Sequence, residues 1–276
     1  MTKTKFFGQL YYIITMKKNI IFFFLFLNLS IVYSQYEIQY DYTMKSFVGD
    51  NNLSSAVTLK TYLYTDGLNS KFVKNRVING KIESEYFNSD SEVLKMLNLK
   101  DRFNSGDSLG EIVIKNNYDN SITIRLLNAS KKKYIKIPDT NILEVELLNE
   151  FKKIDNYNCQ KAKIKNEYRT FVVWFTSEIA INDGPWKLNG VPGLILYAES
   201  LDKRHEFKLT SIKKTDPYDS NFFQFPYDDE MDKTAFIEDY LDAKEKRFKY
   251  GKTKSAEGAT SSLTIDNLEM PLTTFE

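Results

Sequence analysis

The stretch that decides the fold is Trp186-Lys187-Leu188-Asn189-Gly190-Val191-Pro192-Gly193-Leu194-Ile195-Leu196-Tyr197. Pro192 fixes the backbone angle that the second position of a type II turn requires, and Gly193 accepts the positive φ of the third position. The apolar run that begins at Leu194 then predicts a strand. We therefore expect this stretch to shape the fold rather than to carry chemistry.

Strand patterns surround this turn from Gln35 to Thr215. Apolar and polar residues alternate in 36–44, 57–64, 111–115, 122–126, 134–137, 161–165 and 205–213, which is the period of half-buried strands. Asp66-Gly67 is a hairpin turn signal between two of these runs. Residues 171–175 and 194–197 are apolar on both faces, so we expect them at the centre of the sheet, covered on both sides.

Helical periodicity is clear from Asp229 to Tyr250, where acidic residues crowd the start and basic residues the end. Gly251 is the expected terminating residue, and residues 90–99 predict a shorter helix. The predicted fold is mainly β (α+β), with one curved antiparallel sheet or half-barrel wrapped around or packed on the long C-terminal helix. The helix can cover one face of the sheet. The other face is then covered because the sheet closes into a barrel, packs on a partner or forms an apolar cavity that holds a ligand.

The amino terminus has the pattern of a secretory signal. Lys17 and Lys18 precede the apolar run 20–27, and small residues lead to Ser34, after which we expect cleavage. Met16 is the expected start, which makes residues 1–15 an extension. The expected parts are a signal (1–34), a single β-rich domain (35–252) and a loosely ordered polar tail (253–276).

Composition limits the partners. Lys and Arg number 38 against 37 Asp and Glu, so the balance gives no basic patch for nucleic acid. No cysteine stands directly after the apolar run, where cleavage would make it the amino-terminal residue that carries a lipid. No later segment reaches membrane-spanning length. We expect an exported periplasmic or cell-surface protein without a lipid anchor. Cys159 is the only cysteine and cannot form an internal disulfide; it is a buried side chain, a reactive thiol or an intermolecular partner.

Several short elements between residues 150 and 213 resemble the GLPGLI family of exported Bacteroidetes proteins. The hexapeptide of that name corresponds to 190–195, with Val191 in place of leucine. The matching residues are Tyr157, Cys159, Ala162, Arg169, Trp174, Gly184, Pro185, Gly190, Val191, Pro192, Gly193, Leu194 and Ile195. The resemblance implies export and a shared β fold. It implies no reaction and supplies no catalytic residues.

Candidate chemistry is sparse. His205 is the only histidine, so zinc sites built from several His or Cys ligands are excluded, and we interpret it as a solvated turn residue. Carboxylates between Asp216 and Asp232 lack the spacing of a calcium loop and fit helix capping. Glycine-rich phosphate loops are absent from the sequence. We therefore expect no catalytic, cofactor-binding or metal-ligating residues.

Aromatic residues are the candidates for binding. Core or interface packing is the first expectation for such aromatic residues. Trp174, Trp186, Tyr197, Phe223 and Phe225 are the candidates for contact with a ligand or partner. The predicted function is non-enzymatic binding of an apolar small molecule, a lipid or an envelope component. A protein-protein interaction module of the cell envelope is the alternative. A second alternative is an exported hydrolase that uses carboxylates such as Glu178 and Asp183.

Overall fold

A computed structural model describes residues 35–48, 52–79, 81–82, 84–88, 106–128, 131–219, 221–252, 263–265 and 273–275. The predicted signal (1–34), the predicted helix at 90–99 and most of the predicted tail lie outside the described residues. The strands are β1 (Gln35–Val48), β2 (Asn52–Thr65), β3 (Asn69–Lys74), β4 (Val77–Ile78), β5 (Lys81–Ile82), β6 (Ser84–Asn88), β7 (Glu111–Asn116), β8 (Ser121–Asn128), β9 (Lys133–Thr140), β10 (Glu144–Ile154), β11 (Tyr157–Lys165), β12 (Thr170–Thr176), β13 (Leu194–Ser200), β14 (His205–Thr215), β15 (Asp229–Glu230), β16 (Leu263–Ile265) and β17 (Thr273–Phe275). The described helix is α4 (Lys233–Lys252).

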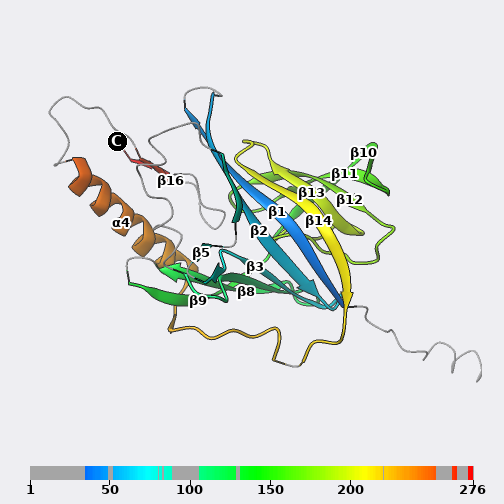
Figure 1. The fold of residues 1–276 in the computed structure, drawn as a ribbon, viewed down its shortest axis with the longest axis horizontal. Coiled ribbons are helices and arrows are strands. Elements are labelled where there is room, and N and C mark those ends of the chain that lie inside the picture. The colour runs from blue at the N-terminus through cyan, green and yellow to red at the C-terminus, as the bar shows by residue number, and fades with distance from the viewer. Residues whose placement is uncertain are drawn as a thin grey trace, which may run out of the picture. The chain divides into compact units, whose positions relative to one another are not determined.

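One 13-stranded sheet dominates the structure (Figure 1). Its order is β10-β11-β12-β13-β14-β1-β2-β3-β7-β8-β9-β15, with β6 paired to β2. Two antiparallel meanders are joined where β14 returns to pair with β1, and β15 pairs in parallel with β9. Two further two-stranded sheets pair β4 with β5 and β16 with β17.

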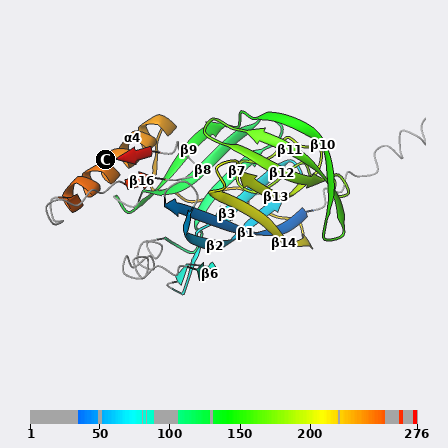
Figure 2. The same ribbon diagram turned by 90° about the horizontal axis from the view of Figure 1, so that it is seen from above.

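The sheet curves back on itself because β10, at one end of the strand order, directly follows β9 in the chain, and β9 lies next to the other end. β9 ends at Thr140 and β10 begins at Glu144, so the link spans at most about 14 Å. In a flat sheet the ten steps between these strands would separate them by roughly 48 Å. In Figure 2, seen from above, β7–β9 and β10–β12 lie along one side of the sheet and β14, β1 and β2 along the other. The curvature therefore creates an inner face with a space to fill.

The connection between β12 and β13 fills that inner face. Ile181, Trp186, Leu188 and Val191 are all buried in the same core as the inward side chains of the strands. The Trp186 ring lies 5.9 Å from the ring of Phe171. Residues 186–191 thus supply the core between the two halves of the sheet.

A buried ion pair fixes this connection to the opposite meander. Lys115 on β7 bonds to Asp183, and both side chains are 1% exposed. Lys115 Nζ also donates to the carbonyl of Gly184 at 2.7 Å. Burial lowers the pKa of Lys115, and the charge of Asp183 opposes that shift.

The predicted packing of the sheet around a long helix is wrong. α4 is 20 residues long and lies beside β9, with Phe236 buried and Ile237 partly buried against the core (Figure 1). The inner face of the sheet was already occupied by the β12–β13 connection, so the helix covers only an end of the structure. The described part of the chain is mostly β.

The helix boundaries also differ from the prediction. Asp232 caps α4, because its Oδ1 accepts from the amides of Thr234 and Ala235 at 2.8 and 3.2 Å. Asp229 lies in β15 instead of the helix. Gly251 lies inside the last turn, since the helix continues to Lys252.

The predicted turn and the predicted central strands need correction. The Gly193 amide donates to the Val191 carbonyl at 2.9 Å, which closes a three-residue turn instead of a type II turn. Gly193 does have a positive φ of 152°, and an added Cβ would lie 2.1 Å from the Thr176 carbonyl oxygen. β12 and β13 have two neighbours each, but the middle of the sheet is β14, β1 and β2.

A strap formed by residues 216–219 and 221–228 crosses the outer face of the sheet between β14 and β15. Tyr218 Oη donates to the Tyr36 carbonyl on β1 at 2.8 Å, and Arg125 Nε on β8 donates to the Pro226 carbonyl at 2.8 Å. The ring of Phe222 also meets the ring of Tyr64 on β2 edge-on at 5.3 Å, so the strap packs on the strands. In the described part of the chain, no helix has the length and apolarity to cross a membrane.

Candidate functional site

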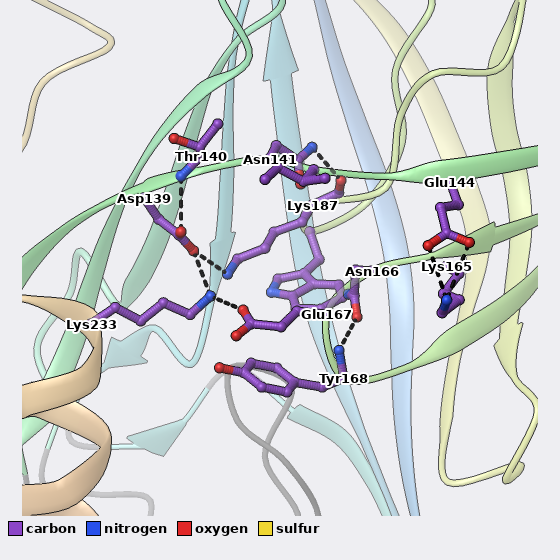
Figure 3. A pocket seen from close by; sticks show the side chains of 12 residues that line it. Asp139, Thr140, Asn141, Glu144, Lys165, Asn166, Glu167, Tyr168, Lys187 and Lys233 are labelled. Carbon is purple, nitrogen blue, oxygen red and sulfur yellow. Dashed lines mark hydrogen bonds and ion pairs between the residues drawn. The ribbon is translucent and has the colours of Figure 1, made fainter.

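One recess of about 460 Å³ lies beside the link between β9 and β10 (Figure 3). We call it the polar pocket. It is lined by Asp139, Thr140, Asn141, Ile142, Glu144, Lys165, Asn166, Glu167, Tyr168, Trp186, Lys187 and Lys233. These residues come from the end of β9, the β9–β10 link, the first residue of β10, the last residue of β11, the β11–β12 turn, the β12–β13 connection (the core connection) and the first residue of α4. Sequence-distant segments thus form one site.

A chain of alternating charges runs through the polar pocket. Asp139 Oδ2 lies 3.3 Å from Lys187 Nζ and 3.1 Å from Lys233 Nζ. Lys233 also bonds to Glu167. The ammonium group of Lys233 lies 5.1 Å from the centre of the Tyr168 ring. Figure 3 shows these four charged side chains pointing toward one another.

The carboxyl groups of this chain are held in the ionised form. Burial alone would raise the pKa of Asp139, but Lys187 and Lys233 hold it below its ordinary value. Burial also opposes ionisation of Glu167, and its bonds to Lys233 and Tyr168 hold its pKa low. A two-carboxylate hydrolase needs one carboxyl with a raised pKa as the general acid. Neither Asp139 nor Glu167 has the raised pKa of such an acid.

Amide side chains hold the core connection against the pocket wall. Asn141 Nδ2 donates to the Lys187 carbonyl at 2.9 Å and to Asn189 Oδ1 at 3.1 Å. Asn189 in turn bonds to Asn117 at 3.1 Å. Trp186 has a positive φ of 54°, so its ring turns into the core while Lys187 reaches Asp139. The backbone geometry of the motif therefore positions one wall of the pocket.

The predicted ligand contacts fall in three places. Trp186 lines the polar pocket. Trp174 and Tyr197 are neighbours on the outer face of β12 and β13, where Lys152 Nζ lies 4.1 and 5.5 Å from their rings. The three residues do not share one surface.

Phe223 and Phe225 lie at a second recess of about 280 Å³ between the strap and the sheet. The remaining lining residues are Ile114, Thr123, Lys136, Gln224 and Tyr227. We call it the aromatic recess. Its walls are mainly apolar or aromatic, so it is the described site that fits an apolar group.

The residues of the family resemblance are structural in position. Most of them are buried, namely Cys159, Ala162, Arg169, Gly184, Pro185, Val191, Gly193, Leu194 and Ile195. Tyr157, Trp174, Gly190 and Pro192 are partly or fully exposed. Arg169 bonds to Asp202 at 2.8 Å. Burial raises the pKa of the Cys159 thiol, which disfavours the reactive thiolate.

His205 is buried, so its interpretation as a solvated turn residue is wrong. Its Nδ1 lies 2.8 Å from Tyr42 Oη, and the two rings stack. The carboxylates named for a hydrolase occupy different environments: Asp183 is buried against Lys115, whereas Glu178 is exposed and accepts from the Asn158 amide. Among the described residues, no three His, Cys, Asp or Glu side chains gather as a metal would require.

Sequence reasoning missed Asp139, Glu167, Tyr168, Lys187 and Lys233. One signal was present, because Lys187 is a charged residue within an otherwise apolar and amide-rich stretch. A buried lysine needs an acidic partner. Its partner Asp139 lies on a strand 48 residues earlier, and the sequence pattern does not show that pairing.

Comparison with known proteins identifies the family. The model described as "N-glycanase peptide, N-terminal domain" matches residues 84–234, which is more than half of the chain. The chain belongs to this family of PNGase F-II N-terminal domains. The comparisons do not identify the GLPGLI family, so that resemblance stays an expectation. None of the curated proteins matches the chain.

Solved structures give more distant similarities. Two structures of PNGF-II, in the P21 and C2 space groups, are each 18% identical with a TM-score of 0.45. Each comparison covers 85% of this chain and 35% of PNGF-II, so the chain spans about a third of that protein. The LolA superfamily protein NE2245 from Nitrosomonas europaea is 9% identical with a TM-score of 0.27, covering 69% of this chain and 90% of its own.

Proposed function

We propose that this chain is a non-catalytic binding domain and that its polar pocket holds a hydroxyl-rich ligand, namely the glycan of a glycoprotein. The observation that carries the proposal is the convergence of charged, amide and aromatic side chains in one recess of about 460 Å³. Sugar hydroxyls both donate and accept hydrogen bonds, as this mixture of ammonium, amide and carboxylate groups requires. The lowered pKa of Asp139 and of Glu167 supports binding over acid catalysis.

The family description supports the choice of ligand, since it names an N-terminal domain of an N-glycanase. The proposed role is to hold the glycan or its carrier. We also propose that the chain is exported, that residues 1–34 are removed, and that the remaining domain binds its ligand outside the cytoplasm. In the polar pocket, Lys233 and Tyr168 would contact the ligand from the pocket rim, because both side chains are partly exposed.

Isothermal titration of the purified chain with released N-glycans tests the proposal. Tyr168→Ala and Lys233→Ala should each weaken binding by about tenfold to a hundredfold, as loss of a charge-assisted or stacking contact does. Lys131→Ala is the matched control, because Lys131 pairs with Asp239 away from the pocket. Equal affinity for the pocket variants and the control, or no binding of any glycan, would refute it.

An apolar ligand is the second candidate function, and the aromatic recess supports it. Ile114, Phe223, Phe225 and Tyr227 line about 280 Å³, which accommodates a short acyl chain or one aromatic side chain better than a whole lipid. Titration with a fluorescent fatty acid distinguishes the two candidates. Binding that Phe223→Ser abolishes and Tyr168→Ala leaves unchanged favours the aromatic recess over the polar pocket.

A further inference from the structure

A buried amine and a buried carboxylate meet in the core, outside both recesses. Lys115 Nζ bonds to Asp183 Oδ1, and both side chains are 1% exposed. The two residues belong to β7 and to the β12–β13 connection, 68 positions apart in the chain. The sequence has one cysteine, so no disulfide can tie these two segments together. A covalent tie between them would have to use other chemistry.

The ion pair is incompletely satisfied in this position. Asp183 Oδ1 accepts from the Gly184 amide at 2.7 Å, but Oδ2 is buried and has no hydrogen-bond partner among the described residues. Lys115 Nζ carries three N–H donors, and its acceptors in the described part of the chain are Asp183 and the Gly184 carbonyl at 2.7 Å. Charged groups without full sets of partners are costly in a dry core. The site therefore favours a neutral product that needs fewer partners.

An amide between the two side chains is such a product. It has a single N–H, for which the Gly184 carbonyl is at hand, and a single carbonyl oxygen, which can keep the Gly184 amide. The carboxylate oxygen without a partner, Oδ2, is the one that is lost. Because the amide carries no charge, the cost of burying two ions disappears.

Burial also brings the amine toward its reactive form. It lowers the pKa of Lys115 against the opposing charge of Asp183, which favours the neutral and nucleophilic amine. The fold holds the two groups in contact, and well-oriented intramolecular reactions reach effective molarities of about 10⁵–10⁸ M.

A buried hydroxyl stands beside the amine. Ser70 on β3 is the ladder partner of Lys115 and is fully buried, so the two side chains are neighbours on the same face. Ser70 Oγ has no hydrogen-bond partner among the described residues. A hydroxyl both donates and accepts, as the relay of a proton requires.

We propose that Lys115 and Asp183 condense to an intramolecular amide once the chain has folded. One proton passes from the ammonium to the carboxylate, and the neutral amine then attacks Cγ of Asp183. The new C–N bond replaces the bond from Cγ to Oδ2, and a second amine proton, relayed by Ser70, leaves with Oδ2 as water. The reaction needs no oxidant and no other reactant. It uses none of the residues that line the polar pocket, so it does not depend on glycan binding.

Mass spectrometry of the purified chain tests the proposal. The wild-type chain should be lighter by one water than its sequence requires. Lys115→Arg keeps the positive charge but cannot form the link, so it should show no such loss; preparing both chains alike cancels any processing of the termini. In a tryptic digest of the unfolded wild-type chain, residues 103–125 should remain joined to residues 170–187, without cleavage after Lys115.

Lys161 and Glu150 are the matched control within the same chain, because they bond at 2.8 Å but are partly exposed; they should stay unlinked. A wild-type chain of full mass that is cleaved after Lys115 overturns the proposal. Loss of one water with the two peptides separate also overturns it, since a succinimide at Asp183-Gly184 would give that result.

The rate of linkage tests the relay. Chains purified unfolded in urea and then allowed to fold should lose water with time, and Ser70→Ala should do so more slowly on the order of a hundredfold, as loss of a proton-transfer group does. Linkage at the same rate in Ser70→Ala and the wild-type chain overturns the relay.

Discussion

The ion pair between Lys115 and Asp183 should be the most sensitive polar contact of the fold. Lys115→Met removes the ammonium group that compensates the Asp183 carboxylate, and both side chains are 1% exposed. The variant leaves Asp183 Oδ1 with the Gly184 amide at 2.7 Å, while Oδ2 has no hydrogen-bond partner. The carboxylate would then be a buried charge without a cation.

The magnitude follows from the cost of an uncompensated buried charge. Removing one partner of a buried pair costs about 3–5 kcal/mol of the free energy of unfolding. A domain of this kind has roughly 5–15 kcal/mol in total, so the single variant should be close to unfolding. Lys115→Met combined with Asp183→Leu removes both charges, and such replacements are often neutral or stabilising. The double variant should therefore be more stable than Lys115→Met.

Urea denaturation followed by tryptophan fluorescence measures these free energies, because Trp186 lies in the same connection as Asp183. Lys161→Ala is the surface control: its pair with Glu150 is partly exposed and should contribute about 0–1 kcal/mol. The reasoning is refuted if Lys115→Met costs no more than the control. It is refuted equally if the double variant is as unstable as the single one.

Three further outcomes test other parts of the structure. Gly193→Ala should lower the midpoint of thermal unfolding strongly, because the added Cβ would lie 2.1 Å from the Thr176 carbonyl oxygen; an unchanged midpoint contradicts the turn geometry. Asp139 has a lowered pKa, so its contribution to stability is present above its unfolded pKa of about 3.9 and is lost as the pH falls through the folded pKa. Urea denaturation at a series of pH values should therefore show that the free energy of unfolding falls less on acidification in Lys233→Ala than in the wild-type chain. Asp232→Ala should cost about 0.5–2 kcal/mol through the lost helix cap, and an undiminished helical circular dichroism and stability would contradict that cap.

The strands could be predicted because their signal is local. Alternation at 36–44 lies within β1, and the run from Leu194 begins β13 where the sequence indicates it. Period-two burial needs only that one face of a strand be covered. The sequence does not show which strand lies beside which, so the return of β14 to β1 and the three-residue link between the sheet ends came only from the structure.

The helix was overestimated because acidic residues before it have long-range partners. Asp228 Oδ2 accepts from the Tyr134 amide at 2.7 Å, 94 positions earlier in the chain, and Asp229 pairs with Ile135 across a parallel ladder. Acidic residues are favoured in the first turn of a helix, so the sequence alone places these carboxylates at the helix start. Tertiary pairing overrides that assignment, and the polar pocket was missed for the same reason.

The polar pocket shares its wall with the core, which links ligand binding to folding. Trp186 and Lys187 are adjacent: one packs on Phe171 in the core and the other bonds to Asp139 in the pocket. A ligand that binds Lys187 or its neighbours therefore binds the folded state and not the unfolded chain. Such a ligand stabilises the fold by about 2.7 kcal/mol at a hundred times its dissociation constant. A glycan that occupies the polar pocket should raise the unfolding midpoint of the wild-type chain, and Lys233→Ala should reduce that increase even where its own stability is little changed.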